Sequence, residues 1–96
     1  MEAITIIGNM GDFAKVTQFE NGAKVARFQF ASHLGEDTIW HRMFAWGTVA
    51  LFIERFGAKG KKMIIKGRKV VRTYLDREGI QKQIEEIEVR EIIGLY

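Results

Sequence analysis

The sequence predicts an all-β fold, a small five-stranded Greek-key barrel with one short α-helix between the third and fourth strands. Two patterns carry this prediction. Along most of the 96 residues apolar and polar side chains alternate with a period near two, which is typical of strands with one buried face. One segment in the middle of the chain changes to helical spacing. A chain of this length supports one hydrophobic core, so we expect a single domain over residues 1–96.

Glycine marks the breaks between the expected elements, and proline is absent. We expect strands at residues 2–8, 24–32, 38–46 and 63–74 and, after a turn at residues 76–79, a fifth strand that ends at residue 92 or 93. In the second strand the alternation directs Phe28 and Phe30 to the core and Arg27 to solvent. Gly67, inside the fourth strand, fits a β-bulge that bends the strand around a corner of the barrel.

The helix is expected over residues 48–56. Its apolar residues stand at i, i+3, i+4 and i+7 and predict a core-facing stripe of Val49, Phe52, Ile53 and Phe56. Thr48 fits the N-cap, and Gly57 fits a left-handed residue after the last turn. Three strands, one helix and two strands are the element order of the OB-fold barrel.

The third strand places aromatic rings and a cation on one face. That face carries Trp40, Arg42, Phe44 and Trp46, and the other carries Ile39, His41, Met43 and Ala45. Burying an unpaired guanidinium costs roughly several kcal/mol, so we expect the face with Arg42 to point to solvent. Phe44 fits either the core or the site. The fourth strand aligns Lys66, Arg68, Val70, Arg72 and Tyr74 on one face, unless a bulge at Gly67 shifts the alternation.

Positive charge is concentrated between residues 55 and 82, although the net charge of the whole chain is only +3. Focused positive charge indicates a polyanionic partner, either nucleic acid or an anionic membrane surface. A solvated Lys/Arg face would give the same count, and charge alone leaves that alternative open. Aromatic rings interleaved with cations favour unpaired bases, since a ring stacks on any base while the cations neutralise the flanking phosphates.

Four segments resemble bacterial single-stranded DNA-binding proteins, in the same order and over almost the whole chain. They are IIGNMG (6–11), NGAKVARFQFAS (21–32), TIWHRMFAWG (38–47) and KGKKMIIKGRKVVRTYLDREG (59–79). The resemblance implies sequence-independent binding of single-stranded DNA in replication, recombination and repair. It also implies a homotetramer built as a dimer of dimers, associated with the nucleoid in the bacterial cytoplasm.

The resemblance also implies roles for individual residues. Trp40 falls on a stacking tryptophan, Trp46 on a stacking phenylalanine, and Tyr74 on a position where the family often has a stacking tryptophan. The cations that fall on the family's DNA path are Arg42, Lys59 and Arg72, and the strand pattern adds Lys66, Arg68 and Arg27. His41 falls on a histidine of the subunit contact, and Ile6 and Asn9 lie in the segment that resembles the dimer contact. An inward histidine is also commonly a structural one, and both roles stay open for His41.

Three features depart from that family. The loop HLGED (33–37) is short and lacks one stacking tryptophan, and Thr48 replaces a common lysine. The chain ends at Tyr96, without the family's flexible linker and acidic tail. We therefore expect no recruitment of partner proteins by the usual acidic tail, as in a short accessory form carried by phages or mobile elements, or in a trimmed chain.

Other classes of function are less compatible with the composition. With no cysteine, one serine and two histidines, no nucleophile–base set or zinc-protease motif can be assembled, so we expect no enzyme, no cofactor and no metal site. No signal peptide or membrane span is expected either. Two alternatives remain: a dimeric primosomal replication protein with an OB fold, and an RNA-binding OB module. The two tryptophans favour the single-stranded DNA-binding class over the primosomal one.

Overall fold

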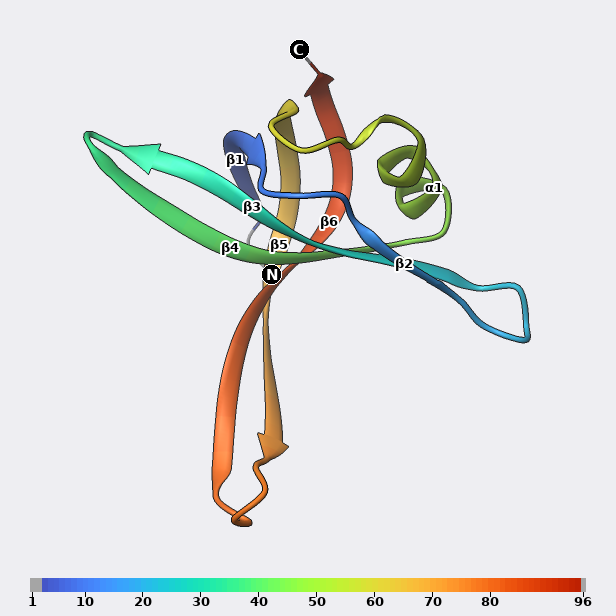
Figure 1. Ribbon diagram of the computed structural model, residues 1–96, viewed down its shortest axis with the longest axis vertical. Coiled ribbons are helices and arrows are strands. Elements are labelled where there is room, and N and C mark those ends of the chain that lie inside the picture. Colours follow the sequence, from blue (N-terminus) through green and yellow to red (C-terminus); the bar gives the residue numbers. More distant parts are fainter. Residues whose placement is uncertain (1–2, 96) are drawn as a thin grey trace.

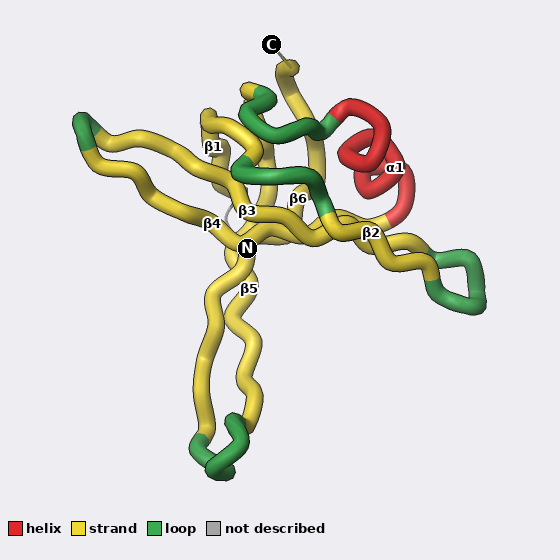
Figure 2. The backbone as a smooth tube through the Cα atoms, in the orientation of Figure 1, coloured by secondary structure: helices red, strands yellow, loops and turns green. Residues whose placement is uncertain are grey.

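The computed structural model describes residues 3–95, which form six strands and one helix (Figures 1 and 2). In chain order the elements are β1 (Ile4–Met10), β2 (Lys15–Gln18), β3 (Lys24–Leu34), β4 (Asp37–Trp46), α1 (Gly47–Phe56), β5 (Lys62–Leu75) and β6 (Gln81–Leu95). The expected elements are therefore all present, with β3 to β6 longer than predicted. Glu2, the first residue of the predicted first strand, lies outside the described residues. None of the described residues belongs to a helix long and apolar enough to cross a bilayer.

Five of the strands close into a ring. The sheet order is β1-β5-β6-β4-β3-β2, and an additional pairing joins β1 to β3 through Asn9 opposite Ala31 and Met10 opposite Phe30. The β4–β6 pairing, Met43 opposite Ile87, is parallel, and the other pairings are antiparallel. This closed ring with a helix between β4 and β5 confirms the predicted OB-fold barrel.

The core fills the ring and is closed at one end by the helix. The predicted core residues Phe28 and Phe30 are 6% and 0% exposed, and Ile53 of α1 is fully buried. Met10, Met43 and the strand residues Met63, Ile65, Ile87 and Val89 complete the cluster. Side chains of this kind supply most of the free energy of folding through burial of apolar surface.

The helix ends at Phe56 as predicted, but its start, its caps and part of its buried face differ from the prediction. The helix begins at Gly47, whose φ of 61° favours glycine, so the N-cap is Trp46 and not Thr48, and no side chain caps the helix. Gly57 has a φ of −81°, so the predicted left-handed ending is wrong. Phe56 is 49% exposed and packs on Phe52, with ring centroids 4.8 Å apart, so the prediction that Phe56 faces the core is also wrong.

The predicted bulge at Gly67 is confirmed, with a different placement of the extra residue. Lys66 pairs with Glu91 and Gly67 with Val89, so the extra residue is Arg90 of β6 and the alternation of β5 continues unbroken. A Cβ atom at Gly67 would lie 2.3 Å from the carbonyl oxygen of Glu88. Glycine therefore allows the two backbones to approach at the point where the β5–β6 ribbon leaves the barrel.

Three two-stranded arms extend from the barrel (Figure 1). They are the β2–β3 turn, the β3–β4 hairpin and the outer half of the β5–β6 hairpin, where Tyr74 pairs with Lys82. The short strand β2, which the sequence analysis missed, forms the first arm by pairing with β3 from Lys15 to Gln18. The arms surround the outer face of β3 and β4, and that face carries the candidate site.

Candidate nucleic-acid interface

The outer face of β4 presents the two tryptophans to solvent. Trp40 is 59% and Trp46 is 45% exposed, whereas Met43 and Ala45 on the other face are almost completely buried. The predicted alternation of this strand is confirmed where it crosses the barrel. Toward the hairpin tip the alternation no longer separates buried from exposed residues, and Ile39 is 41% exposed. The reason is that β3 and β4 extend beyond the core there.

Trp40 packs against the loop that follows β1. A Cβ atom at Gly11 would lie 2.6 Å from Cζ3 and 3.2 Å from Cη2 of the Trp40 ring, so the ring rests on a backbone that only glycine leaves free. The Gly11 N–H donates to the carbonyl oxygen of Gln29 at 2.9 Å, which ties this loop to β3. One side of the indole is thereby supported, and more than half of the side chain stays accessible.

Trp46 is supported by a ring that the sequence analysis missed. Phe19, in the turn between β2 and β3, stacks on it with centroids 5.9 Å apart and an interplanar angle of 27°. Phe19 is itself 46% exposed, so the pair forms a joint aromatic surface at one end of β4. The sequence gives no local signal for this contact, because the turn between residues 18 and 24 determines where Phe19 lies.

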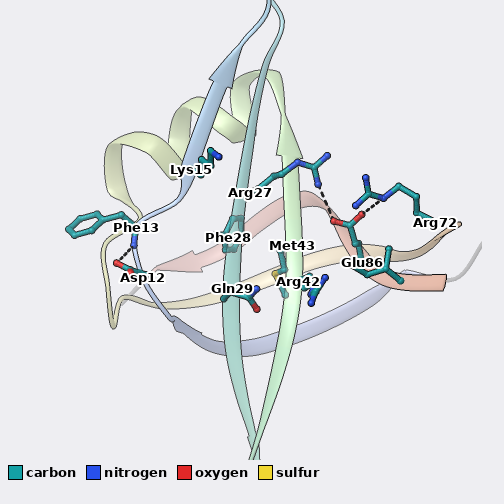
Figure 3. A pocket seen from close by; sticks show the side chains of 11 residues that line it. Asp12, Phe13, Lys15, Arg27, Phe28, Gln29, Arg42, Met43, Arg72 and Glu86 are labelled. Atoms are coloured by element: carbon teal, nitrogen blue, oxygen red, sulfur yellow. Dashed lines mark hydrogen bonds and ion pairs between the residues drawn. The ribbon is translucent and has the colours of Figure 1, made fainter. Parts of the chain in front are cut away.

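Between these aromatic residues lies a groove of about 360 Å³ with several cationic side chains (Figure 3). The residues that line it come from the 11–15 segment, from β3 and β4, and from the β5–β6 hairpin. Its cations are Lys15, Arg27, Arg42 and Arg72, and its acidic residues are Asp12 and Glu86. Within the part of the chain that the structure describes, Arg42 forms no ion pair. We call this feature the arginine groove.

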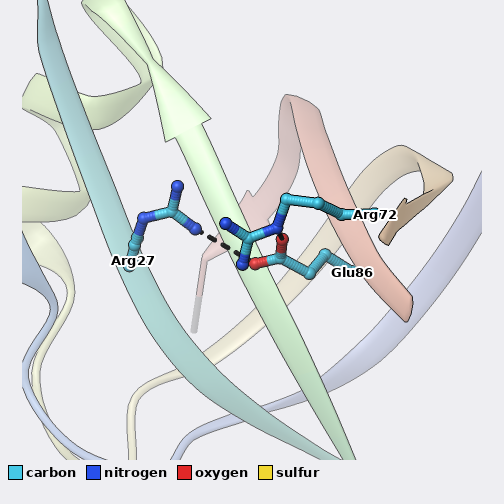
Figure 4. A network of polar contacts seen from close by, with 3 residues as sticks. All are labelled: Arg27, Arg72 and Glu86. Carbon is cyan, nitrogen blue, oxygen red and sulfur yellow. Dashed lines mark hydrogen bonds and ion pairs between the residues drawn. The ribbon is translucent and has the colours of Figure 1, made fainter. Parts of the chain in front are cut away.

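Glu86 of β6 joins two of these arginines (Figure 4). Arg27 Nη1 donates to Glu86 Oε2 at 3.0 Å, and Arg72 Nε donates to Glu86 Oε1 at 3.0 Å. The Glu86 side chain is only 7% exposed, whereas the arginine side chains are 47% and 54% exposed. A guanidinium has five N–H donors, so each arginine retains donors for a ligand such as a phosphate.

Phe44 completes this face. It is half-buried, and Cζ of Arg27 lies 5.6 Å from the centroid of its ring. A cation over an aromatic face at this distance is attracted by the ring quadrupole, typically by about 0.5–1 kcal/mol where the pair is partly exposed. Phe44 therefore helps to position Arg27 in the groove. The alternation of the sequence fits Phe44 to either the core or the site, and the structure places it between the two.

The other predicted cations lie apart from the arginine groove. Lys59 is exposed in the loop between α1 and β5. Lys66 is exposed on β5, where it pairs with Thr5 of β1 and Glu91 of β6. Arg68 forms an ion pair with Glu88, which also accepts from Arg90 at 3.1 Å. The structure thus brings together Arg27, Arg42 and Arg72 with the tryptophans, while Tyr74, 48% exposed, lies further out on the arm that carries Arg72.

Two of the three predicted subunit-contact residues meet at a second cavity of about 360 Å³. Ile6 and His41 line it together with Lys69 and Glu85, and Trp40 and Arg42 of the candidate site line it as well. The His41 Nε2 lies 2.7 Å from the Ser32 hydroxyl. Burial lowers the pKa of His41 below its ordinary value of 6.5, the charge of Lys69 acts in the same direction, and Glu85 opposes both. Asn9 lies elsewhere, donating to the carbonyl oxygen of Gly60 at 3.0 Å.

The chemistry of the site is that of binding. Between residues 3 and 95 no three acidic, histidine or cysteine side chains gather closely enough to hold a metal ion. The arginine groove instead offers aromatic faces and cationic donors. Such a surface matches a flexible polyanion that carries unpaired planar bases.

Comparison with known proteins agrees with this chemistry. The profile of the family described as "Single-strand binding protein family" matches residues 1–95. A single-stranded DNA-binding protein of Bacteroides thetaiotaomicron is 30% identical over 95 residues, which cover 88% of this chain and 59% of the relative. "Single-stranded DNA-binding protein 1" of Chlorobaculum tepidum is 29% identical (91% and 60% covered), and "Single-stranded DNA-binding protein 2" of Streptomyces coelicolor is 28% identical (93% and 50% covered).

The chain spans about half to three fifths of the length of these curated relatives. The match to the family extends over nearly the whole chain and includes all the strands that form the barrel. The family is one of binding proteins without enzymatic activity, which supports the prediction that the chain is not an enzyme. The chain belongs to the single-strand binding protein family.

Proposed function

We propose that this protein binds single-stranded DNA with little regard to sequence, by stacking bases on the rings of β4 and pairing phosphates with the cations of the arginine groove. The observation that carries the proposal is the outer face of β4, where Trp40, Arg42 and Trp46 follow one another and both indoles are about half exposed. Large aromatic rings usually stabilise a fold by being buried. Rings that are held in place but left accessible are suited to a ligand with flat apolar faces.

The supports of the two tryptophans strengthen this proposal. Trp40 rests on Gly11 and Trp46 stacks on Phe19, so each ring already has a contact on one side before a base arrives. A binding surface that is already ordered loses less conformational entropy on association. The arginine groove lies on the same β3–β4 face, and within residues 3–95 its Arg42 forms no ion pair.

Tryptophan fluorescence tests the proposal directly, because the chain has two tryptophans and both lie on this face. We expect dT oligomers to quench the emission strongly, with a site size on the order of 4–16 nucleotides per barrel. Duplex DNA of equal length is the control and should compete poorly. If duplex competed as well as the single strand, base stacking would be refuted. An rU oligomer of equal length separates DNA from RNA binding.

We propose further that the protein assembles as a homotetramer, a dimer of dimers. Two features support this assembly: Ile7 of β1 and Ile93 of β6 are 55% and 52% exposed, and the cavity of Ile6 and His41 opens on the barrel wall. Burial of exposed apolar side chains by a second subunit makes the free energy of association more favourable. Sedimentation equilibrium at micromolar concentration should give four subunits. Two would favour the primosomal class, and a stable monomer would contradict the assembly.

The cellular role follows from the binding mode. Coating of exposed single strands during replication, recombination and repair in the bacterial cytoplasm, at the nucleoid, is the role that we propose. The bacterial origin of the three similar proteins supports it. The protein should shield a dT oligomer from a single-strand-specific nuclease in proportion to the fraction bound. Rapid degradation of a saturated oligomer would contradict a protective role.

A further inference from the structure

Phe13 is the most exposed aromatic residue between residues 3 and 95. Its exposed fraction is 70%, compared with 59% for Trp40 and 45% for Trp46. The phenylalanine side chain has no polar atom that hydrogen-bonds to water. Covering its ring with a ligand therefore contributes favourably to the free energy of binding. No local pattern predicts a role for Phe13, since the segment around it follows neither a strand nor a helix period.

The backbone that carries Phe13 is anchored on both sides. On one side the Gly11 N–H donates to the Gln29 carbonyl oxygen at 2.9 Å, and within the loop the Phe13 N–H donates to Oδ1 of the adjacent Asp12 at 2.8 Å. On the other side Ala14 packs against the core cluster, and β2 begins at Lys15. The ring is therefore presented by a fixed loop, which lowers the entropy cost of binding to it.

Phe13 lies at the edge of the arginine groove. In Figure 3 the 11–15 segment forms one side of the groove and Arg72 the opposite side, with β3 and β4 between them. The ring points outward from the loop, at the far side from Arg72. Trp40 touches the same loop at Gly11, two residues before Phe13. Phe13 thus borders the cationic groove and lies two residues from the Gly11 backbone on which Trp40 rests.

We propose that Phe13 is a further base-stacking residue of this interface. The single strand would then cross β3 and β4 from the β5–β6 arm to the 11–14 loop, with one base against the Phe13 ring and the adjoining phosphates near Lys15 and Arg42. A ring flanked by cations is the arrangement that holds an unpaired base and its backbone. This inference rests on the proposed single-stranded DNA binding and adds a contact to it.

Three substitutions of Phe13 and one control test the inference. Phe13→Ala removes the ring, Phe13→Leu keeps an apolar side chain without a π-face, and Phe13→Trp enlarges the stacking surface. Phe56→Ala is the control, because Phe56 is likewise an exposed phenylalanine but lies on α1, packed against Phe52 and outside the groove. Thermal unfolding of each variant establishes that the barrel is intact.

The decisive comparison uses two ligands of equal length, a dT oligomer and the same sugar–phosphate chain without bases. We expect Phe13→Ala to weaken dT binding by roughly 5- to 150-fold, the range for one stacked base, and to leave binding of the abasic chain unchanged. Phe13→Leu should bind dT nearly as weakly as the alanine variant. Phe13→Trp should bind dT at least as tightly as the wild type and add emission that dT quenches.

Other outcomes overturn the inference and leave the proposed function distinguishable from it. If the wild type is quenched by dT and Phe13→Ala binds dT equally well, Phe13 is no contact, although the protein binds single strands. An equal loss on both ligands would mean that the ring only holds the loop. A change in subunit number in Phe13→Ala would assign the ring to a contact between copies of this chain. Absence of dT binding by the wild type would refute the proposed function itself.

Discussion

Individual aromatic side chains differ in what covers them, and this difference separates the core from the candidate site. Phe30 is completely buried and meets Phe28 edge-on at a centroid distance of 6.4 Å. Trp40 and Trp46 have similar apolar area, but each has support on one side and water on the other. Substitution should therefore affect stability in the first group and binding in the second.

Alanine variants of one residue from each group measure this separation. Trp40→Ala and Trp46→Ala should each weaken binding of single-stranded DNA by about 1–3 kcal/mol, with little change in the melting temperature. Phe28→Ala should lower the free energy of unfolding by about 3–5 kcal/mol, since it empties core volume. Thermal melts and dT titrations on the same samples give both quantities. A collapse of the melting temperature in Trp40→Ala with unchanged DNA affinity would place the site on the wrong face of β4.

His41 predicts a pH dependence of stability. Its pKa is lowered in the folded protein by burial and by Lys69, so the folded state disfavours the proton that the unfolded chain accepts near pH 6.5. Stability is therefore fully present above pH 6.5 and is lost as the pH falls toward the lower pKa of the folded state. Urea unfolding between pH 7.5 and 5.5 should show a smaller loss in His41→Gln than in the wild type. Equal losses in both proteins would mean that His41 is not the titrating group.

Some site residues could be predicted from the sequence and others could not. Trp40, Arg42 and Trp46 alternate along one strand, so local geometry was enough to predict that they share an exposed face. The roles of Glu86 and Phe19 in the site depend on which distant strands and turns come together in the fold. Glu86 reaches Arg27 across 59 positions of the sequence, and no local pattern separates it from the solvated Glu85. Phe13 lies in a segment with neither strand nor helix periodicity, so no local pattern predicts that it belongs to the site.

At the scale of elements, the long strands and the extent of the helix were predictable, whereas the short strand β2 and the caps of the helix were not. Alternation marked β3, β4 and β5 because each has one face against the core. The four-residue strand β2 has too few residues for a period. β4 runs directly into the helix at Gly47, one residue before the predicted start, and the buried helix residues are Ala50 and Ile53, whereas Phe56 lies in solvent.

The bulge between β5 and β6 yields a prediction about these elements. Gly67→Ala would place a Cβ atom 2.3 Å from the backbone oxygen of Glu88, and backbone atoms cannot move aside without breaking the strand pairing. Gly94→Ala is the control in the same strand pair, because its Cβ would meet the flexible Ile64 side chain at 3.1 Å. Overpacking typically costs about 1–3 kcal/mol, and we expect Gly67→Ala to reach or exceed that range and Gly94→Ala to stay below it. Urea unfolding measures both, and equal stability of the two variants would contradict the close approach.

At the scale of the whole molecule, charge is distributed unevenly. The net charge of +3 hides a positive segment between residues 55 and 82, and folding brings part of it beside Arg27 and Arg42 of the β3–β4 face. Acidic residues of β6 neutralise other members of that segment, as Glu88 does for Arg68 and Glu85 for Lys69. Charge counted along the sequence predicted a polyanion site, but pairing between strands decides which cations remain available.

Salt dependence tests which cations bind phosphate. The logarithm of the dT binding constant should fall linearly with the logarithm of salt concentration, by roughly 0.7 per neutralised phosphate. Arg42→Ala should flatten this slope, because Arg42 is exposed and unpaired in the described part of the chain. Lys69→Ala removes the same charge from a side chain that pairs with Glu85 at 3.2 Å and does not line the arginine groove, and it should leave the slope nearly unchanged. An equal effect of both variants would indicate attraction by net charge alone.

The three arms around the barrel have a consequence for motion. Beyond the core each arm is a two-stranded ribbon, and such ribbons are only marginally stable in water. Their backbone amides should exchange hydrogen for deuterium through local opening, far faster than those of β1 or the inner half of β5, which open only with the whole barrel. In the proposed binding mode, single-stranded DNA that crosses β3 and β4 first contacts the part of these strands that lies on the barrel. The arms then close on the bound DNA. Tyr74, near the end of one arm, would therefore lengthen the residence time of a bound strand more than it speeds the first encounter.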